Sequence, residues 1–268
     1  MMDTTLDTSL LQLADRLWVA GQDRKPVPPL REEAARLGMA TTPQNAYAIQ
    51  RINRDRRIRA GDRVVGRKIG LTSVAVQKQL GVDSPDFGAL WAGTSWADGG
   101  EVQLSQLIQA KVEAEVALVM RSDVTSPTAT VADLIRATDF ALAALEIVDS
   151  RIADWKIGLF DTIADNASAA GFVLGADPVK LDRVALREAK MVMTRNGEQV
   201  SEGIGKACLG HPLNAAAWLA RTLAQMGDPL REGDVLLTGA LGPMVAAKQG
   251  DVFEARIEGL GAVGVKFA

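Results

Sequence analysis

The stretch Lys111-Val-Glu-Ala-Glu-Val-Ala-Leu-Val-Met120 has an apolar residue at every even-numbered position. Side chains at i and i+2 of a β-strand point to the same side, so this alternation predicts a strand with one wholly apolar face. The other face carries Lys111, Glu113 and Glu115. On a helix the two glutamates would diverge by roughly 200° around the axis. The stretch therefore predicts a strand that presents two neighbouring carboxylates on one face.

Glu113 and Glu115 repel each other unless a cation or a proton lies between them. A Glu-x-Glu stretch alone also fits a charged, solvent-exposed strand face, because matches this short are common by chance. A third carboxylate, Glu146, is the only charge within the apolar run 140–148. A glutamate in such a run is rarely buried unless it is paired or coordinated. The three carboxylates together predict a divalent-cation site that suits Mg²⁺ or Mn²⁺.

The composition is that of a packed globular protein, with 268 residues, 47% hydrophobic and 24% charged. The net charge of −3 argues against a nucleic-acid or anionic-membrane partner. The lone cysteine, Cys208, excludes an intrachain disulfide and fits a reducing cytosol. The start of the chain lacks the features of a signal peptide, and no apolar stretch is long enough to cross a bilayer. We expect a soluble, cytoplasmic protein without membrane contact.

Histidine is almost absent from the chain, since His211 is the only one. This excludes a multi-histidine zinc site and a two-histidine iron site, so any metal must be held by oxygen. His211 precedes a predicted helix, where a capping or packing role is favoured over catalysis.

The first 60 residues are predicted to be helical. Apolar spacing indicates helices over residues 5–20 and 29–38. A third helix begins with Thr42 as N-cap and Pro43 as first helical residue, and it ends near Gly61. We expect an N-terminal helical extension that is followed by a larger catalytic body, with bounds 1–60 and 61–268.

The body is predicted to be rich in strands. Helices and strands do not alternate regularly along it, so an α+β fold is favoured over a doubly wound sheet. The expected elements are a strand within 62–70, a helix over 130–140 with Thr130 and Asp133 as caps, a hairpin over 191–200 turning at Asn196-Gly197, a helix over 211–226 closed by Gly227, and strands within 233–239 and 250–267.

Two further residues are candidates for proton transfer. Lys68 lies in an apolar, glycine-flanked strand, where burial would lower its pKa. The alternative is a lysine that extends to the surface, and the motif alone does not separate the two. Asp86 lies in a turn predicted over residues 83–88, where aspartate is also favoured for turn formation alone. The polar segment 161–168 offers hydroxyl and amide donors to a carboxylate.

Seven motifs in a fixed order identify a family. Together they resemble the 2-hydroxypenta-2,4-dienoate (2-keto-4-pentenoate) hydratases of the fumarylacetoacetate hydrolase superfamily, and the likeness covers nearly the whole chain. The motifs are Gly66-Arg-Lys-Ile-Gly-Leu-Thr-Ser73, Pro85-Asp-Phe-Gly88, Val112-Glu-Ala-Glu115, Leu145-Glu-Ile-Val148, Ala164-Asp-Asn-Ala-Ser168, Leu209-Gly-His-Pro212 and Leu237-Thr-Gly-Ala-Leu-Gly-Pro-Met244.

The resemblance implies an α+β fold with a mixed β-roll or barrel-like body and a small N-terminal helical module. It also implies roles for residues at the matching positions. These are Glu113, Glu115 and Glu146 as ligands of Mg²⁺ or Mn²⁺, Lys68 and Asp86 as acid/base residues, and Asn166, Ser168 and Thr238 as contacts of the substrate carboxylate.

The implied activity is metal-dependent addition of water to 2-hydroxypenta-2,4-dienoate, or to a short alkyl homologue, in the meta-cleavage catabolism of aromatic compounds. The product is then 4-hydroxy-2-oxopentanoate. The related 4-oxalocrotonate decarboxylases are the alternative, although Arg67-Lys-Ile69 and Leu241-Gly-Pro-Met244 look like the hydratase branch. A non-catalytic oxo-acid-binding or decarboxylase-supporting subunit is the alternative outside enzymes. The family further implies a homo-oligomer, as pentamer or decamer, and allows a complex with a pathway enzyme.

Overall fold

The computed structural model describes residues 4–73, 77, 82 and 84–268. Its longer helices are α1 (Thr4–Asp23), α2 (Leu30–Arg36), α3 (Pro43–Arg59), α5 (Val131–Ala137), α6 (Leu159–Ala164) and α7 (Pro212–Gln225). Its strands are β1 (Val64–Gly70), β2 (Asp86–Trp91), β3 (Ser95–Trp96), β4 (Glu101–Val102), β5 (Lys111–Met120), β6 (Thr138–Val148), β7 (Ala169–Leu174), β8 (Lys190–Arg195), β9 (Glu198–Ile204), β10 (Val235–Ala240), β11 (Val245–Ala246), β12 (Val252–Ile257) and β13 (Gly261–Phe267).

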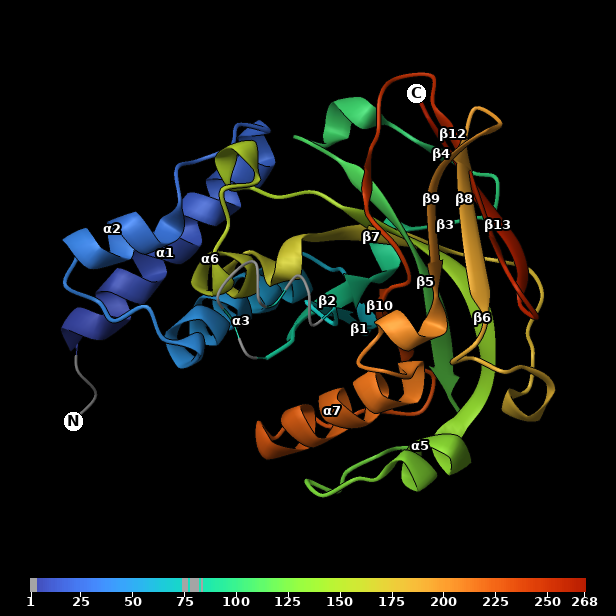
Figure 1. Cartoon of the computed structure of the whole chain (residues 1–268). Helices are drawn as coiled ribbons and strands as arrows, with labels where there is room; N and C mark the ends of the chain where they lie inside the picture. Colours follow the sequence, from blue (N-terminus) through green and yellow to red (C-terminus); the bar gives the residue numbers. More distant parts are fainter. Residues whose placement is uncertain (1–3, 74–76, 78–81, 83) are drawn as a thin grey trace.

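A large mixed sheet holds the middle of the molecule. Over the described ranges it contains eight strands in the order β2-β1-β10-β5-β6-β7-β3, with β11 beside β5. The β1–β10 and β3–β7 pairs are parallel, and the other pairs are antiparallel. Strand β2, at one end of this order, also contacts β7 near the other end. The sheet therefore curls into a half-barrel (Figure 1).

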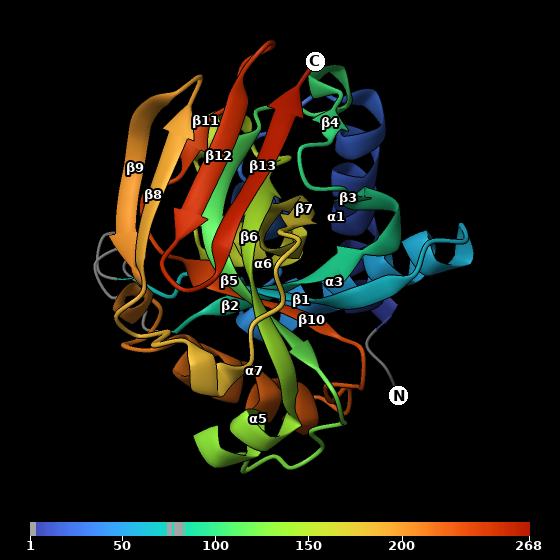
Figure 2. The same ribbon diagram turned by 90° about the vertical axis from the view of Figure 1, so that its right-hand side faces the viewer.

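A second sheet covers one face of this half-barrel. Its order is β4-β13-β12-β8-β9, which makes five strands in the part of the chain that the structure describes. Figure 2 shows it lying over β5 and β6. Val116 and Leu118, on the apolar face of β5, share one buried core with Phe253 and Val265 of the second sheet. The opposite face of β5 and β6 is thus left inside the half-barrel, and the α+β fold with a mixed β-roll body is confirmed.

The N-terminal helices α1, α2 and α3 lie together on one side of the roll (Figure 1). They share a small core with α6, in which Leu13, Ile49 and Phe160 are buried. The Thr42 hydroxyl caps α3 by accepting from the Asn45 amide, as its sequence predicts. Burial of an apolar stripe on each helix explains why these segments fold against α6.

Most predicted elements of the body are confirmed, including the Thr130–Asp133 capping box and the hairpin between β8 and β9. His211 caps α7, since its Nδ1 accepts from the Leu213 amide. The helix predicted over 130–140 is too long, because β6 already begins at Thr138. A buried strand position suits the β-branched and aromatic residues that begin β6 better than a helix does.

The turn predicted over residues 83–88 is also wrong in its second half. Asp86 begins β2, where it pairs with Gly70 of β1. Pairing of apolar neighbours on β1 and β2 outweighs the local turn preference of aspartate. Asp83 lies outside the described residues. Among those that are described, no helix is long and apolar enough to cross a membrane.

Candidate active site

Strand pairing brings the three predicted glutamates together. Glu113 of β5 lies directly opposite Glu146 of β6 in the antiparallel register. Glu115 projects to the same face as Glu113, since the two are separated by one residue of a strand. One ligand atom from each of the three carboxylates lies within 4.8 Å of the others. The cluster predicted from sequence is therefore a compact group of oxygens inside the half-barrel.

Several oxygens of this group lack a hydrogen-bond donor in the described part of the chain, although Glu146 also has a cationic neighbour, Lys68. Within the described residues, Glu115 Oε1 and both oxygens of Glu146 accept no hydrogen bond. Glu115 Oε2 does accept one, from the Gly239 amide at 2.7 Å. Burial raises the pKa of each of the three carboxyls, that of Glu146 to about 7. Buried, converging and unsatisfied oxygens fit a hard divalent cation, which takes carboxylate ligands.

Lys68 of β1 lies beside this cluster and is only 4% exposed. Its Nζ forms an ion pair with Glu146 Oε1 at 3.1 Å, and it donates to the Ala167 carbonyl at 2.9 Å. Burial by itself lowers the pKa of Lys68. The nearby carboxylates, first Glu146 and then Glu113, raise it by more, so the net pKa lies above its ordinary value. The prediction of a lowered pKa is therefore wrong, because it left out the charges that folding brings near. Lys68 is a buried ammonium donor.

Asp86 faces the same space from β2. Its Oδ2 accepts from the Thr162 hydroxyl at 2.9 Å, whereas Oδ1 has no hydrogen-bond partner in the described part of the chain. A Cβ on Gly70 would collide with Oδ1, so the glycine makes room for this carboxyl. Burial raises the pKa of Asp86, and Lys68 opposes that rise. A raised pKa and a free oxygen suit proton transfer. Thr162 lies within the polar segment 161–168, but its contact with Asp86 was not predicted from the sequence.

Asn166 is half-buried and Thr238 is buried near the site, but their side-chain polar atoms form hydrogen bonds with the backbone. Asn166 Oδ1 accepts from the Ala89 amide at 2.7 Å, and its Nδ2 donates to the Ala89 carbonyl at 3.0 Å. The Thr238 hydroxyl donates to the Val116 carbonyl at 2.9 Å. Their role as contacts of a substrate carboxylate stays a prediction.

A strained turn contacts Lys68. Asn166, Ala167 and Ser168 all adopt left-handed backbone angles, with φ of 57°, 50° and 55°. Such angles cost about 1–3 kcal/mol for each residue other than glycine. The Ser168 hydroxyl donates to Asp165 at 3.3 Å, so its predicted substrate contact also stays a prediction. The middle residue of the turn presents the carbonyl that Lys68 contacts.

Comparison with known proteins shows the family to which the chain belongs. The sequence profile of the fumarylacetoacetate (FAA) hydrolase C-terminal family matches residues 65–268. The chain therefore belongs to this family. A solved structure with a similar fold along the whole chain is the 4-oxalocrotonate decarboxylase from Pseudomonas putida G7, complexed with magnesium and adipate. Its TM-score is 0.93 at 35% identity, with 98% of each chain covered.

Sequence relatives are more similar still. A 2-keto-4-pentenoate hydratase from Burkholderia vietnamiensis strain G4 is 56% identical over 261 residues, which cover 97% of this chain and 98% of that protein. The TodF product hydratase of Pseudomonas putida strain F1 is 51% identical over 267 residues, which cover 100% of this chain and 98% of that protein. The chain is thus similar from end to end to hydratases.

The raised pKa of Glu146 gives a first prediction. The pKa is about 7 in the folded protein, against an ordinary value of 4.5. Between these values the folded state binds more protons than the unfolded state, so ion-free protein should lose stability as the pH rises through this window. Glu146→Gln cannot titrate. In EDTA, the melting temperature of the variant minus that of the wild type should increase from about pH 5 to about pH 8. If the melting temperatures of the two proteins change in parallel with pH, Glu146 does not ionise in this range as a buried group.

Proposed function

We propose that the protein is a metal-dependent hydratase that adds water to 2-hydroxypenta-2,4-dienoate, or to a short alkyl homologue, and forms 4-hydroxy-2-oxopentanoate. The observation that carries this proposal is the 56% identity to a 2-keto-4-pentenoate hydratase over nearly the entire length of both chains. The gathered carboxylates and the buried lysine supply the groups that such a reaction needs. Water addition in the meta-cleavage catabolism of aromatic compounds is the corresponding cellular role.

Glu113, Glu115 and Glu146 would hold one divalent ion, Mg²⁺ or Mn²⁺. The convergence of the three carboxylates, and the buried oxygens of Glu115 and Glu146 that accept no hydrogen bond from the described residues, support this assignment. When bound, the ion supplies Lewis-acid polarisation to a 2-oxo acid. The Gly239 amide keeps one oxygen of Glu115 oriented. An ion of double positive charge would also oppose the carboxylate effect that raises the pKa of Lys68.

Lys68 and Asp86 are the proton-handling residues in this proposal. The reaction needs a proton at C5 of the dienol, water at C4, and a second proton at C3. The Lys68 ammonium can donate to the oxygen on which negative charge develops, since its Nζ lies beside Glu146. Asp86 Oδ1 is free to carry a proton, while Oδ2 stays fixed by Thr162. Their closeness in one buried space supports a shared role in proton transfer.

Decarboxylation of a 2-oxo-3-enedioate is the alternative reaction. It is supported by the structural likeness to a decarboxylase, at the lower identity of 35%. A diacid substrate needs a further cationic group for its second carboxylate. Among the described residues, the cations that affect the pKa of Glu113 are Lys68 and Lys111. The Lys111 ammonium lies 4.3 Å from the centroid of the Trp155 ring, which it contacts.

The two reactions are separated by offering both substrates. With Mg²⁺, we expect turnover of the monoacid dienol with solvent oxygen at C4, and little CO₂ release from 2-oxohex-3-enedioate. Mass spectrometry of the product formed in H₂¹⁸O and a CO₂ assay measure the two outcomes. Because the oxo group at C2 exchanges oxygen with water, the product is first equilibrated in unlabelled water, which removes label from C2. It is then reduced with borohydride, so that the ¹⁸O that remains is the oxygen at C4. Rapid CO₂ release from the diacid without ¹⁸O in the monoacid product would favour the decarboxylase.

We also propose the assembly and setting that the family resemblance implies. The chain divides into a helical extension over residues 1–60 and a catalytic body over residues 61–268. It forms a homo-oligomer of five or ten subunits and acts in the cytoplasm. It can also form a complex with a pathway enzyme. The start of the family match at residue 65 supports the division. Sedimentation velocity of the purified protein measures the subunit number directly.

A further inference from the structure

We infer that Asp165 and Arg151 are positioning residues, which hold the turn Asn166–Ser168 so that the Ala167 carbonyl keeps Lys68 beside Glu146. This inference rests on the proposed function, because it assigns to the pair an effect on the proton-handling lysine. Within the described part of the chain, neither residue forms a hydrogen bond or ion pair with the carboxylate cluster. Their effect is therefore expected on the rate of the reaction more than on ion binding.

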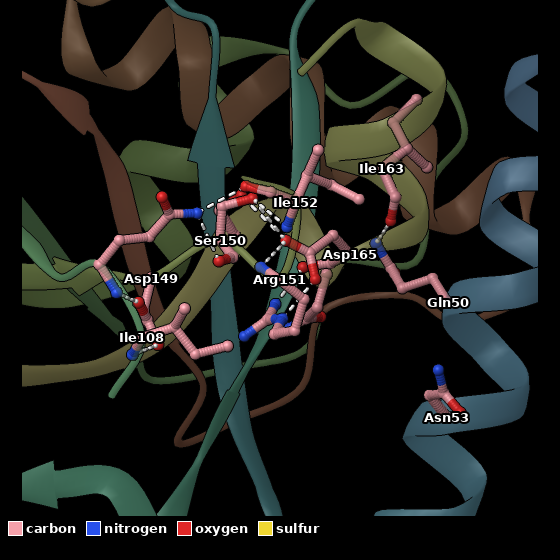
Figure 3. A network of polar contacts seen from close by, with 12 residues as sticks. Gln50, Asn53, Ile108, Asp149, Ser150, Arg151, Ile152, Ile163 and Asp165 are labelled. Carbon is pink, nitrogen blue, oxygen red and sulfur yellow. Dashed lines mark hydrogen bonds and ion pairs between the residues drawn. The ribbon is translucent and has the colours of Figure 1, made fainter. Parts of the chain in front are cut away.

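Asp165 is a buried carboxylate, 2% exposed, with an unusually complete set of donors. Its oxygens accept from the Arg151 side chain, from the Arg151 amide at 3.0 Å and from the Ser150 hydroxyl at 3.1 Å. The Arg151 guanidinium also donates to the Asp165 backbone carbonyl. Figure 3 shows Ser150, Arg151 and Asp165 linked in this way, with Asp149 and Ile152 beside them. A charged pair with this many bonds fixes the backbone on which it sits.

The strained turn begins directly after Asp165 and is anchored at both ends. The Ser168 amide donates to the Asp165 carbonyl at 3.0 Å, and the Ser168 carbonyl accepts from the Asp149 amide at 2.8 Å. On the other side, the carbonyl of Asn166 lies so close to Gly88 that a Cβ there would collide with it. Left-handed residues other than glycine persist only where the surroundings over-determine them. The Asp165 network provides that restraint.

The reason for holding the turn is the acceptor that it presents. A lysine has a flexible stem and three donors, so several nearby carboxylates can attract it in different directions. The Ala167 carbonyl accepts one donor of Lys68 at 2.9 Å, in addition to the ion pair that Lys68 forms with Glu146. With this neutral acceptor in place, the ammonium has one defined position. A displacement of about 1 Å at such a group can cost about 10²-fold in rate.

Asp165→Asn tests the inference, because it keeps the size of the side chain and removes the charge that binds Arg151. We expect kcat to fall by about 10- to 100-fold, with KM for the dienol and affinity for Mg²⁺ nearly unchanged. Asp62→Asn is the matched control, since Asp62 also accepts from an arginine, Arg57, and from backbone amides, those of Arg63 and Gly93. The control should lower stability without the loss of kcat. Equal kcat losses in the two variants at equal stability would overturn the inference.

A second measurement does not require activity. The ¹H–¹⁵N signal of a lysine ammonium is seen when its protons exchange slowly, and Lys68→Met assigns that of Lys68. We expect the signal in the wild type and in Asp62→Asn, and its broadening or loss in Asp165→Asn and in the milder Arg151→Lys. An unchanged signal in both variants would overturn the positioning role. Loss of the signal in a protein that does not hydrate the dienol would instead reject the proposed function and keep the positioning role.

Discussion

Replacement of Lys68 by methionine is expected to lower kcat by about 10²- to 10⁴-fold, because it removes the buried ammonium that faces the carboxylate cluster. Affinity for Mg²⁺ should stay the same or increase, since a positive charge next to Glu146 is lost. Lys111→Met is the matched control. Lys111 lies on the same strand as the glutamates and also affects the pKa of Glu113, but it is partly exposed and packs against Trp155. Its loss should therefore lower kcat far less than the loss of Lys68.

The same reasoning applies to Asp86→Asn, which keeps a hydrogen-bond acceptor for Thr162 and removes the titrating group. Its kcat should also fall by about 10²-fold or more. Stopped-flow measurement of dienol consumption, with circular dichroism melting of each variant, separates a lost catalytic group from a lost fold. Near-wild-type kcat in both Lys68→Met and Asp86→Asn would show that the acid/base assignment is incorrect.

Glu146→Gln is expected to have the second large effect, on ion binding. The substitution removes a charged oxygen donor from the centre of the cluster, so Mg²⁺ affinity should fall by more than the roughly 10- to 100-fold that is typical of outer-shell changes. Hydration should then require far more Mg²⁺. In EDTA the variant should melt no lower than the wild type at neutral pH, since one of three mutually repelling carboxylates has gone.

Isothermal titration with Mg²⁺ and melting with and without the ion measure both parts of this prediction. Glu188→Gln is a suitable control, because Glu188 is an exposed glutamate that pairs with Arg187 at the surface. An ion affinity equal to that of the wild type in Glu146→Gln would remove Glu146 from the ligand set. A large fall in melting temperature in EDTA would instead mean that the charge of Glu146 stabilises the ion-free fold, through Lys68.

The strand that carries Glu113 and Glu115 was predictable, because period-two alternation with one fully apolar face is typical of a half-buried strand and does not fit a helix. Glu146 was predictable as a buried partner, because a charge within an apolar strand needs compensation. The pairing of Glu113 with Glu146 was not, since the register depends on how β5 and β6 meet in the folded sheet. The family motifs, unlike the periodicity, implied that Glu113, Glu115 and Glu146 belong to one ligand set.

The wrong and missing predictions have the same cause, because they concern contacts that form only in the folded protein. The pKa direction of Lys68 was wrong because burial is visible in the sequence, whereas the four carboxylates around it are not. The left-handed turn Asn166–Ser168 could not be predicted, since local preference disfavours Ala167 there and only tertiary contacts hold it. Asp165 lies within one of the family motifs, yet its role depends on Arg151, which reaches it from the loop after β6.

Anomalous diffraction from a crystal soaked in Mn²⁺ tests the central claim most directly. If Glu113, Glu115 and Glu146 hold one divalent ion, a single strong manganese peak will lie among their three carboxylates, with Lys68 beside it and still in contact with the Ala167 carbonyl. The same peak should be absent from a crystal of Glu146→Gln soaked in the same way. Manganese bound only elsewhere, or a Lys68 ammonium occupying the space between the carboxylates in the soaked wild type, would contradict the claim.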